Sequence, residues 1–303
     1  MKQLLVSALV AAMFCFQSGV SLAESQDTSS VKQFTVGSLT VFAILDRDSP
    51  MNINLFTGPL GEKKRVDLAG GINAPASVNV FLVKHPKGNI LVDAGFGSFG
   101  PGENKLAERL KSAGFTFDDI DYVVLTHMHP DHIGGLLAGL NASFSKAAVL
   151  VAEPEAEYWR SQITPVRFYG DENAQKAPTV VEAFLGAYID SLRTFNFNEE
   201  LLPGLTALAA VGHTPGHTVF RLTDGGETLL FVGDIIHAAA LQFPEPEECA
   251  MFDLDKEKAV ETRRAVLTLA SANNYPIAGA HLPFHGLGRV KAEGKSFIYS
   301  PLD

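Results

Sequence analysis

The sequence contains very little cysteine. Only Cys15 and Cys249 occur among its 303 residues. Cys15 lies in an apolar N-terminal segment that we expect to be removed, which leaves Cys249 without a partner for an internal disulfide. Cys249 also sits in an acidic stretch, residues 246–249, that would raise the pKa of a thiol and make it a poor nucleophile. The sequence therefore excludes a disulfide-stapled fold and gives little support for cysteine catalysis.

Basic residues are also scarce. Lysine and arginine number 24 against 34 acidic residues, for a formal net charge of −10, and charged residues make up only 19% of the chain. Nucleic acids and anionic membranes are bound by clusters of lysine and arginine, so this composition argues against both partners. It is compatible with a small neutral organic substrate.

Long apolar runs are absent except near the start of the chain. Residues 1–2 give a positive start, residues 4–16 are apolar, and residues 21–23 form a small-x-small cleavage site. This pattern is typical of a secretory signal peptide, and a retained membrane anchor is the alternative. We expect a signal peptide over residues 1–23 and an exported protein, in the periplasm or the medium. One domain is expected over residues 24–303, because no linker-like segment divides the sequence.

Strand-like and helix-like segments alternate through that domain. Short apolar runs predict strands over residues 33–46, 78–83, 89–92, 121–126, 148–151, 205–211, 218–222, 228–232 and 277–280. Helical spacing predicts helices over residues 105–113, 134–140, 153–161, 178–194 and 256–273. Residues 46–64 and the segment after residue 280 are predicted as loops. The alternation indicates an α/β fold in which two sheets carry helices on their outer faces.

The strongest chemical signal is a cluster of histidines at the end of a predicted strand. His127, His129, Asp131 and His132 follow the apolar run of residues 121–126. Imidazole and carboxylate groups suit zinc and similar divalent metals. Four such groups so close together fit a pair of metals better than one, with the first two serving one ion and the last two the other.

Three later motifs place further candidate ligands at strand ends. Residues 212–217 form a turn containing His213 and His217, Asp234 follows an apolar strand, and His281 does the same. Active sites are commonly built from loops at one edge of a rigid sheet scaffold. We therefore expect these side chains to meet the first cluster at one site.

Together these segments resemble the metallo-beta-lactamase superfamily, and within it the methyl parathion hydrolase-like group, which includes lactonases. The resemblance is carried by residues 126–135, 212–218 and 292–295 together with Asp234 and His281, and it extends in order and spacing over nearly the whole expected domain. It implies an αβ/βα sandwich of two mixed sheets with helices on the outer faces. It also implies two divalent metal ions, zinc by default, and a homodimer.

The resemblance further implies a role for each candidate ligand. The first metal would be held by His127, His129 and His217, the second by Asp131, His132 and His281, and Asp234 would bridge them. A hydroxide shared by the two ions would be the nucleophile, because metal binding lowers the pKa of water toward neutrality. Asp131 would also act catalytically, as a proton shuttle. His213 is expected to be structural.

Other positions are assigned by the same resemblance. Asp93 would support a ligand histidine from behind, with a simple turn as the alternative. Phe99, Trp159 and Phe184 align with aromatic positions that line the substrate pocket, although all three could instead be core residues. His237 stands where the organophosphate-degrading members carry an apolar side chain, which favours a lactone or carboxylic ester as substrate.

The sequence therefore predicts a metal-dependent hydrolase that opens a lactone or cleaves an aryl ester, with a small molecule as its partner and no membrane contact after signal cleavage. Hydrolysis of an organophosphate triester is the nearest alternative, because the same metal pair can stabilise negative charge at carbon or at phosphorus. An alternative of another class is a non-catalytic binding protein, a relic that keeps the fold of the metal-binding members. Such a relic is expected to hold little or no metal.

Overall fold

The computed structural model describes residues 30–161 and 176–302. The predicted signal peptide, residues 1–23, and Cys15 lie outside the described residues. Within the described ranges, no helix combines the length and the apolar character needed to cross a membrane.

The first half of the chain builds a mixed seven-stranded sheet, with strand order β1-β2-β6-β7-β8-β11-β12. The four N-terminal strands pair antiparallel, whereas β7, β8, β11 and β12 run parallel to one another. The strands are β1 (Val31–Val36), β2 (Leu39–Asp48), β6 (Ser77–Lys84), β7 (Ile90–Val92), β8 (Tyr122–Val124), β11 (Ala148–Ala152) and β12 (Leu192–Phe195).

The second half builds another mixed seven-stranded sheet, with strand order β13-β14-β15-β16-β18-β19-β20. Only β16 and β18 pair in parallel. The strands are β13 (Glu200–Leu202), β14 (Leu205–Ala209), β15 (Thr218–Asp224), β16 (Glu227–Gly233), β18 (Ile277–Gly279), β19 (Leu287–Glu293) and β20 (Ser296–Pro301).

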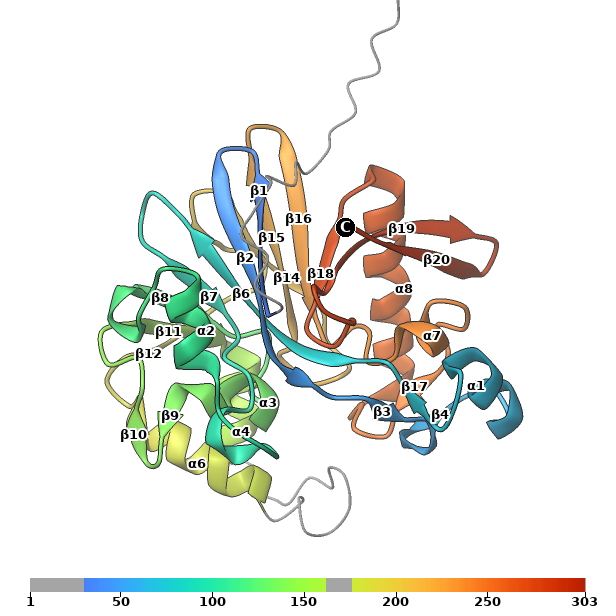
Figure 1. The fold of residues 1–303 in the computed structure, drawn as a ribbon, viewed down its shortest axis with the longest axis horizontal. Helices are drawn as coiled ribbons and strands as arrows, with labels where there is room; N and C mark the ends of the chain where they lie inside the picture. The colour runs from blue at the N-terminus through green and yellow to red at the C-terminus, as the bar shows by residue number, and fades with distance from the viewer. Residues whose placement is uncertain (1–29, 162–175, 303) are drawn as a thin grey trace, which may run out of the picture.

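Helices cover the outer faces of both sheets, so the molecule has four layers (Figure 1). The first sheet carries α2 (Leu106–Ser112), α3 (Pro130–Ile133), α4 (Glu153–Ser161) and α6 (Lys176–Ala187). The second sheet carries the long α8 (Lys256–Asn273) and α7 (Ala239–Gln242). A small group beside α7 contains α1 (Glu62–Ala69), β3 (Met51–Asn52), β4 (Phe56–Thr57), β5 (Asn73–Ala74) and β17 (Cys249–Ala250). Short elements complete the chain: β9 (Leu137–Ala138), β10 (Asn141–Ala142), and single 3-10 turns η1 (Ile53–Leu55), η2 (Gly97–Phe99), η3 (Phe117–Asp119) and η4 (Gly134–Leu136).

Apolar side chains fill the three spaces between these layers. On β2, Phe42 belongs to the core under the helices of the first sheet, whereas Val41 and Ala43 belong to the core between the two sheets. Successive strand residues point to opposite faces, so a strand buried on both faces needs an unbroken apolar run. Phe81 and Phe231 meet in the central core, with ring centroids 5.4 Å apart. The predicted αβ/βα sandwich is confirmed.

Four local predictions were wrong. The helix predicted over residues 134–140 is a 3-10 turn followed by the small hairpin β9–β10, and the helix predicted over 178–194 ends at Ala187 before strand β12. The predicted loop at 46–64 contains short strands and the start of α1, and the predicted C-terminal loop contains the β19–β20 hairpin. In each case pairing with a distant or flanking strand decided the structure, and the local apolar spacing does not report such pairing.

Candidate metal centre

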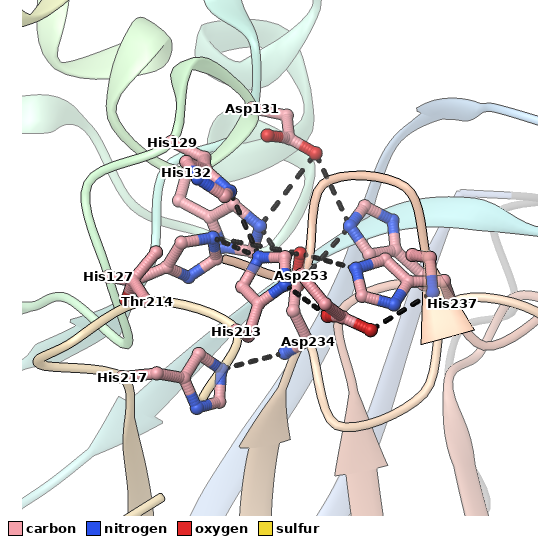
Figure 2. A network of polar contacts seen from close by, with 12 residues as sticks. His127, His129, Asp131, His132, His213, Thr214, His217, Asp234, His237 and Asp253 are labelled. Carbon is pink, nitrogen blue, oxygen red and sulfur yellow. Dashed lines mark hydrogen bonds and ion pairs between the residues drawn. The ribbon is translucent and has the colours of Figure 1, made fainter. Parts of the chain in front are cut away.

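The candidate ligands meet where strands of the two sheets end side by side. Asp93 directly follows β7, and His127 lies just beyond the neighbouring parallel strand β8. In the second sheet, Asp234 directly follows β16, and His281 lies just beyond its parallel neighbour β18. Parallel strands end at the same edge of a sheet, so each sheet delivers its polar side chains to a common point. Figure 2 shows His127 and Asp234 converging on this point.

Three imidazoles and one carboxylate form the first cluster. The ligand atoms of His127, His129, His213 and Asp234 all lie within 4.8 Å of one another, and all four residues are buried. His213 Nε2 lies 3.2 Å from His127 Nε2 and 2.9 Å from His129 Nδ1. It also lies 3.2 Å from Asp234 Oδ2. This spacing places four ligands around one point.

Two imidazoles and two carboxylates form the second cluster, made of Asp131, His132, Asp234 and His281. Asp234 Oδ1 lies 3.1 Å from His132 Nε2 and 3.2 Å from His281 Nε2. The other oxygen, Oδ2, faces the histidines of the first cluster. Asp234 is therefore placed between the clusters with one oxygen toward each, as a bridging ligand requires.

His217 is not part of either cluster, which corrects the sequence prediction. Its Nε2 accepts a hydrogen bond from the backbone N–H of Asp234 at 3.0 Å, and its Nδ1 donates to the carbonyl of Ala210 at 3.1 Å. Both ring nitrogens are thus occupied by backbone groups. Burial, followed by the nearby His213, lowers the pKa of His217 to about 3, so the ring is neutral. His213, expected to be structural, takes the ligand position instead.

The donor set fits divalent metal ions. His132 Nδ1 lies 2.8 Å from the carboxylate of Asp93, so a neutral ring donates there and keeps the lone pair on Nε2. That lone pair faces Asp234 Oδ1, and neither atom has a hydrogen-bond partner among the residues that the structure describes. Two buried acceptors at this distance need a proton or a cation between them. Imidazole nitrogen and carboxylate oxygen are suitable ligands for zinc and its neighbours.

Comparison with known protein families agrees with this geometry. The profile of the metallo-beta-lactamase superfamily matches residues 74–281, a segment that contains every residue of both clusters. The chain belongs to the metallo-beta-lactamase superfamily. It is a metal-dependent hydrolase, and the two His/Asp clusters are the sites for two divalent metals.

Individual members of the superfamily resemble the chain at a modest level of identity. The N-acyl homoserine lactonase AttM of Azorhizobium caulinodans is 27% identical over 192 residues, which is 55% of this chain and 68% of AttM. The hydrolase AbOPH matches with a TM-score of 0.83 at 29% identity, over 92% of this chain and 99% of AbOPH. AidC, a dizinc quorum-quenching lactonase in complex with a product, matches with a TM-score of 0.83 at 27% identity, over 90% and 98%.

Asp93 supports the second cluster of this superfamily member from behind. Its Oδ2 lies 2.8 Å from His132 Nδ1, and Thr126 donates its backbone N–H to Oδ1 and its hydroxyl to Oδ2, both at 2.8 Å. A carboxylate in this position fixes the tautomer and orientation of a ligand histidine and raises its basicity. The contact is the one that the family resemblance implied for Asp93.

Two further groups hold ligand rings, and sequence reasoning did not identify them. Asp253 Oδ1 lies 2.8 Å from His213 Nδ1, and the buried Arg263 donates to the other oxygen of Asp253 at 3.4 Å. The carbonyl of Ser77 lies 3.1 Å from His281 Nδ1. In the sequence, Asp253 is one acid among several near an acidic stretch, and no spacing rule connects it with a turn 40 residues earlier.

The electrostatics differ between the two clusters. Burial and the neighbouring histidines hold the pKa values of His127 and His129 well below the usual range. At His132 and His281 burial also opposes charge, but the surrounding carboxylates outweigh it, and the pKa of His281 is raised to about 10. The same positive groups hold the pKa of Asp234 below its usual range. Without metal, the second cluster therefore retains protons on both histidines, whereas the first retains a proton on His213, whose pKa Asp234 and Asp253 raise to about 9 against the effect of burial.

The predicted pocket aromatics lie in or beside the hydrophobic core. Phe184 is fully buried and packs against Tyr188, with ring centroids 5.3 Å apart, which is the core role left open as the alternative. Trp159 is also buried, and its ring packs T-shaped against the ring of His129, with centroids 5.8 Å apart. Phe99 is partly buried against the same core. The structure therefore corrects Phe184 and Trp159 from pocket lining to packing.

His237 is fully buried and contacts the bridging carboxylate. Its Nε2 lies 3.0 Å from Asp234 Oδ2, and its ring stacks on that of His281 with centroids 5.3 Å apart. Burial lowers the pKa of His237 to about 4, against the opposing charge of Asp234. His237 therefore acts on Asp234 as a neutral hydrogen-bond donor, and the predicted pocket position is corrected.

Proposed function

We propose that this enzyme hydrolyses lactones with the help of two divalent metal ions, zinc being the first candidate. The observation that supports it most is the pair of His/Asp clusters that share Asp234, one oxygen toward each. The lactone is suggested by the likeness to AttM, an N-acyl homoserine lactonase, and to AidC, a dizinc lactonase, at comparable levels of identity.

The two clusters support a ligand assignment. His127, His129 and His213 would hold the first ion and Asp131, His132 and His281 the second, with Asp234 shared. Divalent ions held there would supply a water of lowered pKa as the nucleophile and would polarise the carbonyl oxygen of an ester. The protein contributes fixed ligand rings, since Asp93, Asp253 and the carbonyl of Ser77 each hold the second ring nitrogen of one histidine.

Asp131 is suited to moving a proton. It is 7% exposed, against 3% or less for the other cluster residues, so it is the cluster side chain most open to substrate. Although burial opposes it, the positive charge at His132 and His281 holds the pKa of Asp131 below its usual range. An ionised Asp131 can accept a proton from water as the carbonyl is attacked. It can then return the proton to the alkoxide oxygen released when the ring C–O bond breaks.

A neutral substrate fits the charge of the chain. With a net charge of −10, the protein repels anions at long range but not neutral lactones or aryl esters. The sequence argument that His237 favours a lactone does not apply in its original form, because this buried ring contacts Asp234. The charge does not separate a lactone from a phosphotriester, which is also neutral, so the preference for a lactone rests on the relatives.

The test compares three substrates on zinc-loaded and chelated protein: an N-acyl homoserine lactone, the aryl lactone dihydrocoumarin, and the phosphotriester methyl parathion. We expect both lactones to be opened much faster than the triester, with activity lost on chelation and restored by zinc. An Asp234→Asn variant is the matched control for contaminating lactonase. Faster cleavage of the triester would contradict the lactonase proposal, and absence of turnover and of bound metal would favour the non-catalytic relic.

We also propose that the protein is exported after removal of residues 1–23 and functions as a homodimer. The support is the N-terminal charge and apolar pattern for export, and the family resemblance for the dimer. N-terminal sequencing of protein recovered from the periplasm or the medium should begin at Glu24, and light scattering should give twice the mass of the processed chain. Full-length protein in the cytoplasm, or a monomer at micromolar concentration, would contradict the respective proposals.

A further inference from the structure

Glu155, at the start of helix α4, is a fully buried carboxylate with four hydrogen-bond donors. Its Oε1 accepts from the backbone N–H of Met128 at 2.9 Å and from Trp159 Nε1 at 2.7 Å. Its Oε2 accepts from the hydroxyl of Thr214 at 2.6 Å and from the backbone N–H of Gly216 at 2.9 Å. Both oxygens are therefore satisfied, each by two donors.

These donors belong to the two segments that carry the histidines of the first cluster. Met128 lies between His127 and His129, and Thr214 directly follows His213. The two segments are 86 residues apart in sequence and come from different sheets, yet His213 Nε2 lies within 3.2 Å of His127 Nε2. Glu155 links both segments through a single carboxylate, and two of its four bonds go to backbone amides.

Close packing reinforces this link. A Cβ at Gly216 would lie 2.3 Å from the backbone nitrogen of Glu155, so the turn approaches helix α4 as closely as only glycine permits. Trp159 donates its N–H to Glu155, and its ring packs T-shaped against the ring of His129, with centroids 5.8 Å apart. Glu155 therefore orients one histidine of the cluster through its indole neighbour, as well as through the backbone.

The four partners of Glu155 are all neutral groups. Burial raises the pKa of Glu155, and the four hydrogen bonds act against that shift. A buried carboxylate costs free energy that a well-packed apolar residue in its place would avoid. Keeping such a group here requires a benefit, and its contacts locate that benefit at the first cluster.

The second cluster is organised by other groups. Asp93 and Thr126 hold His132, and the carbonyl of Ser77 holds His281. The clusters share Asp234, and the Thr126 hydroxyl that donates to Asp93 also lies 3.1 Å from His127 Nδ1. The backbone and hydroxyl contacts of Glu155, in contrast, go to Met128, Thr214 and Gly216, in the segments that carry the first cluster.

We propose that Glu155 is a positioning residue for the first metal. It fixes the distance between the His127–His129 segment and the His213 turn, and so sets the affinity for the first ion while leaving the second ion largely unaffected. The proposal rests on the two-metal function proposed above.

The experiment measures both zinc affinities of the intact protein by competition with a chromophoric chelator, alongside circular dichroism and thermal unfolding. Glu155→Gln keeps the size of the side chain but directs an NH₂ group at donors. Thr214→Val removes one hydroxyl donor at nearly constant volume. We expect Glu155→Gln to weaken one of the two zinc sites by about 10–100-fold, the effect typical of groups that orient metal ligands, and Thr214→Val to weaken the same site less.

Combined variants assign the affected site, with Asp93→Asn as the matched control for the other one. In the Glu155→Gln background, adding His213→Ala should leave the remaining high-affinity site unchanged, whereas adding His281→Ala should abolish it. In the Asp93→Asn background, adding His281→Ala should leave the remaining high-affinity site unchanged, whereas adding His213→Ala should abolish it.

Wild-type affinities at both sites in folded Glu155→Gln and Thr214→Val proteins would overturn the positioning role. Equal weakening of both sites would also overturn it, since that result indicates a general loss of stability. If Glu155→Gln does not fold, the two zinc affinities of Thr214→Val provide the test: a weakened first site supports the proposal, and unchanged or equally weakened sites overturn it. A wild-type protein that binds no zinc would instead contradict the proposed function itself, so the two failures are distinguishable.

Discussion

The two halves of the metal centre share a carboxylate but differ in charge. The first cluster combines His127, His129 and His213 with Asp234, whereas the second combines His132 and His281 with Asp131 and Asp234. In the first, the pKa values of His127 and His129 are lowered, so these two rings are neutral, and His213, whose pKa is raised to about 9, holds a proton. In the second, carboxylates keep the histidines protonated until a metal replaces the proton. One fold thus prepares two sites of different proton occupancy around a common ligand.

The largest expected effect comes from removing the ligand that the clusters share. In Asp234→Ala both clusters lose a carboxylate oxygen, and His132 and His281 lose the carboxylate that lies 3.1 and 3.2 Å from their Nε2 atoms. We expect lactone hydrolysis to fall below detection and zinc content to fall below one ion per chain, measured by turnover and by elemental analysis. Retained activity with two bound ions would contradict the assignment of Asp234 as the bridge.

The next largest effect should separate the two histidines of the 212–217 turn. His213→Ala removes a cluster ring, so zinc at the first site and turnover should both be lost. His217→Ala removes contacts to the backbone of Asp234 and Ala210 but no cluster ring, so it should lower thermal stability and leave two zinc ions bound. Zinc analysis of both variants under identical conditions is the test. The reverse pattern would restore His217 as the ligand.

A smaller effect is expected from pH. In the metal-free protein the pKa of His213 is about 9 and that of His281 about 10, both raised by carboxylates against the effect of burial. Both rings carry a proton at pH 7 and must lose it to bind a cation, so zinc affinity should rise with pH by about tenfold per unit for each proton released. Calorimetry in buffers of different ionisation enthalpy measures this release. Zinc uptake without proton release would contradict the protonation of these two rings in the metal-free protein.

The raised pKa values of these two histidines have the opposite effect on folding: the stability of the metal-free chain should fall as pH rises. Raised histidine pKa values contribute stability that is fully present below the unfolded-state pKa of 6.5 and is lost as pH rises through about 9 to 10. Chelated protein should therefore unfold at progressively lower temperature over this range. A flat or rising midpoint would show that the clusters do not hold protons.

The smallest effect is expected at His237. His237→Phe removes one hydrogen bond to Asp234 Oδ2 while keeping a ring to stack on His281. A hydrogen bond of about 0.5–1.5 kcal/mol corresponds to a loss of about two- to tenfold in turnover. The ratio of lactone to triester rates should stay constant. A shift of that ratio toward the triester would show that His237 determines specificity after all.

The sequence was most informative where local pattern and tertiary structure agree. The helix predicted over residues 256–273 matches α8, and the strand ends that carry His127, Asp234 and His281 lie where the apolar runs stop. These features depend on short-range periodicity and on strands buried on both faces, which leave a clear trace in the residue order.

The remaining features depend on contacts between distant segments. His213 and His217 lie in one turn, and which ring faces the metals is decided by the backbone N–H of Asp234, which occupies His217. Glu155 lies 27 to 61 residues from its partners in the two histidine segments, and Asp253 lies 40 residues from His213, so no motif connects these acids with the clusters. The β19–β20 hairpin was missed because many residues of both strands are polar or exposed, so the sequence shows no regular apolar alternation there.

Anomalous diffraction at the zinc edge, from crystals of the zinc-loaded protein, tests the metal centre most directly. We expect two zinc peaks, one contacting His127, His129 and His213, the other contacting Asp131, His132 and His281, with Asp234 touching both. A single peak, or a peak coordinated by His217 in place of His213, would contradict this arrangement.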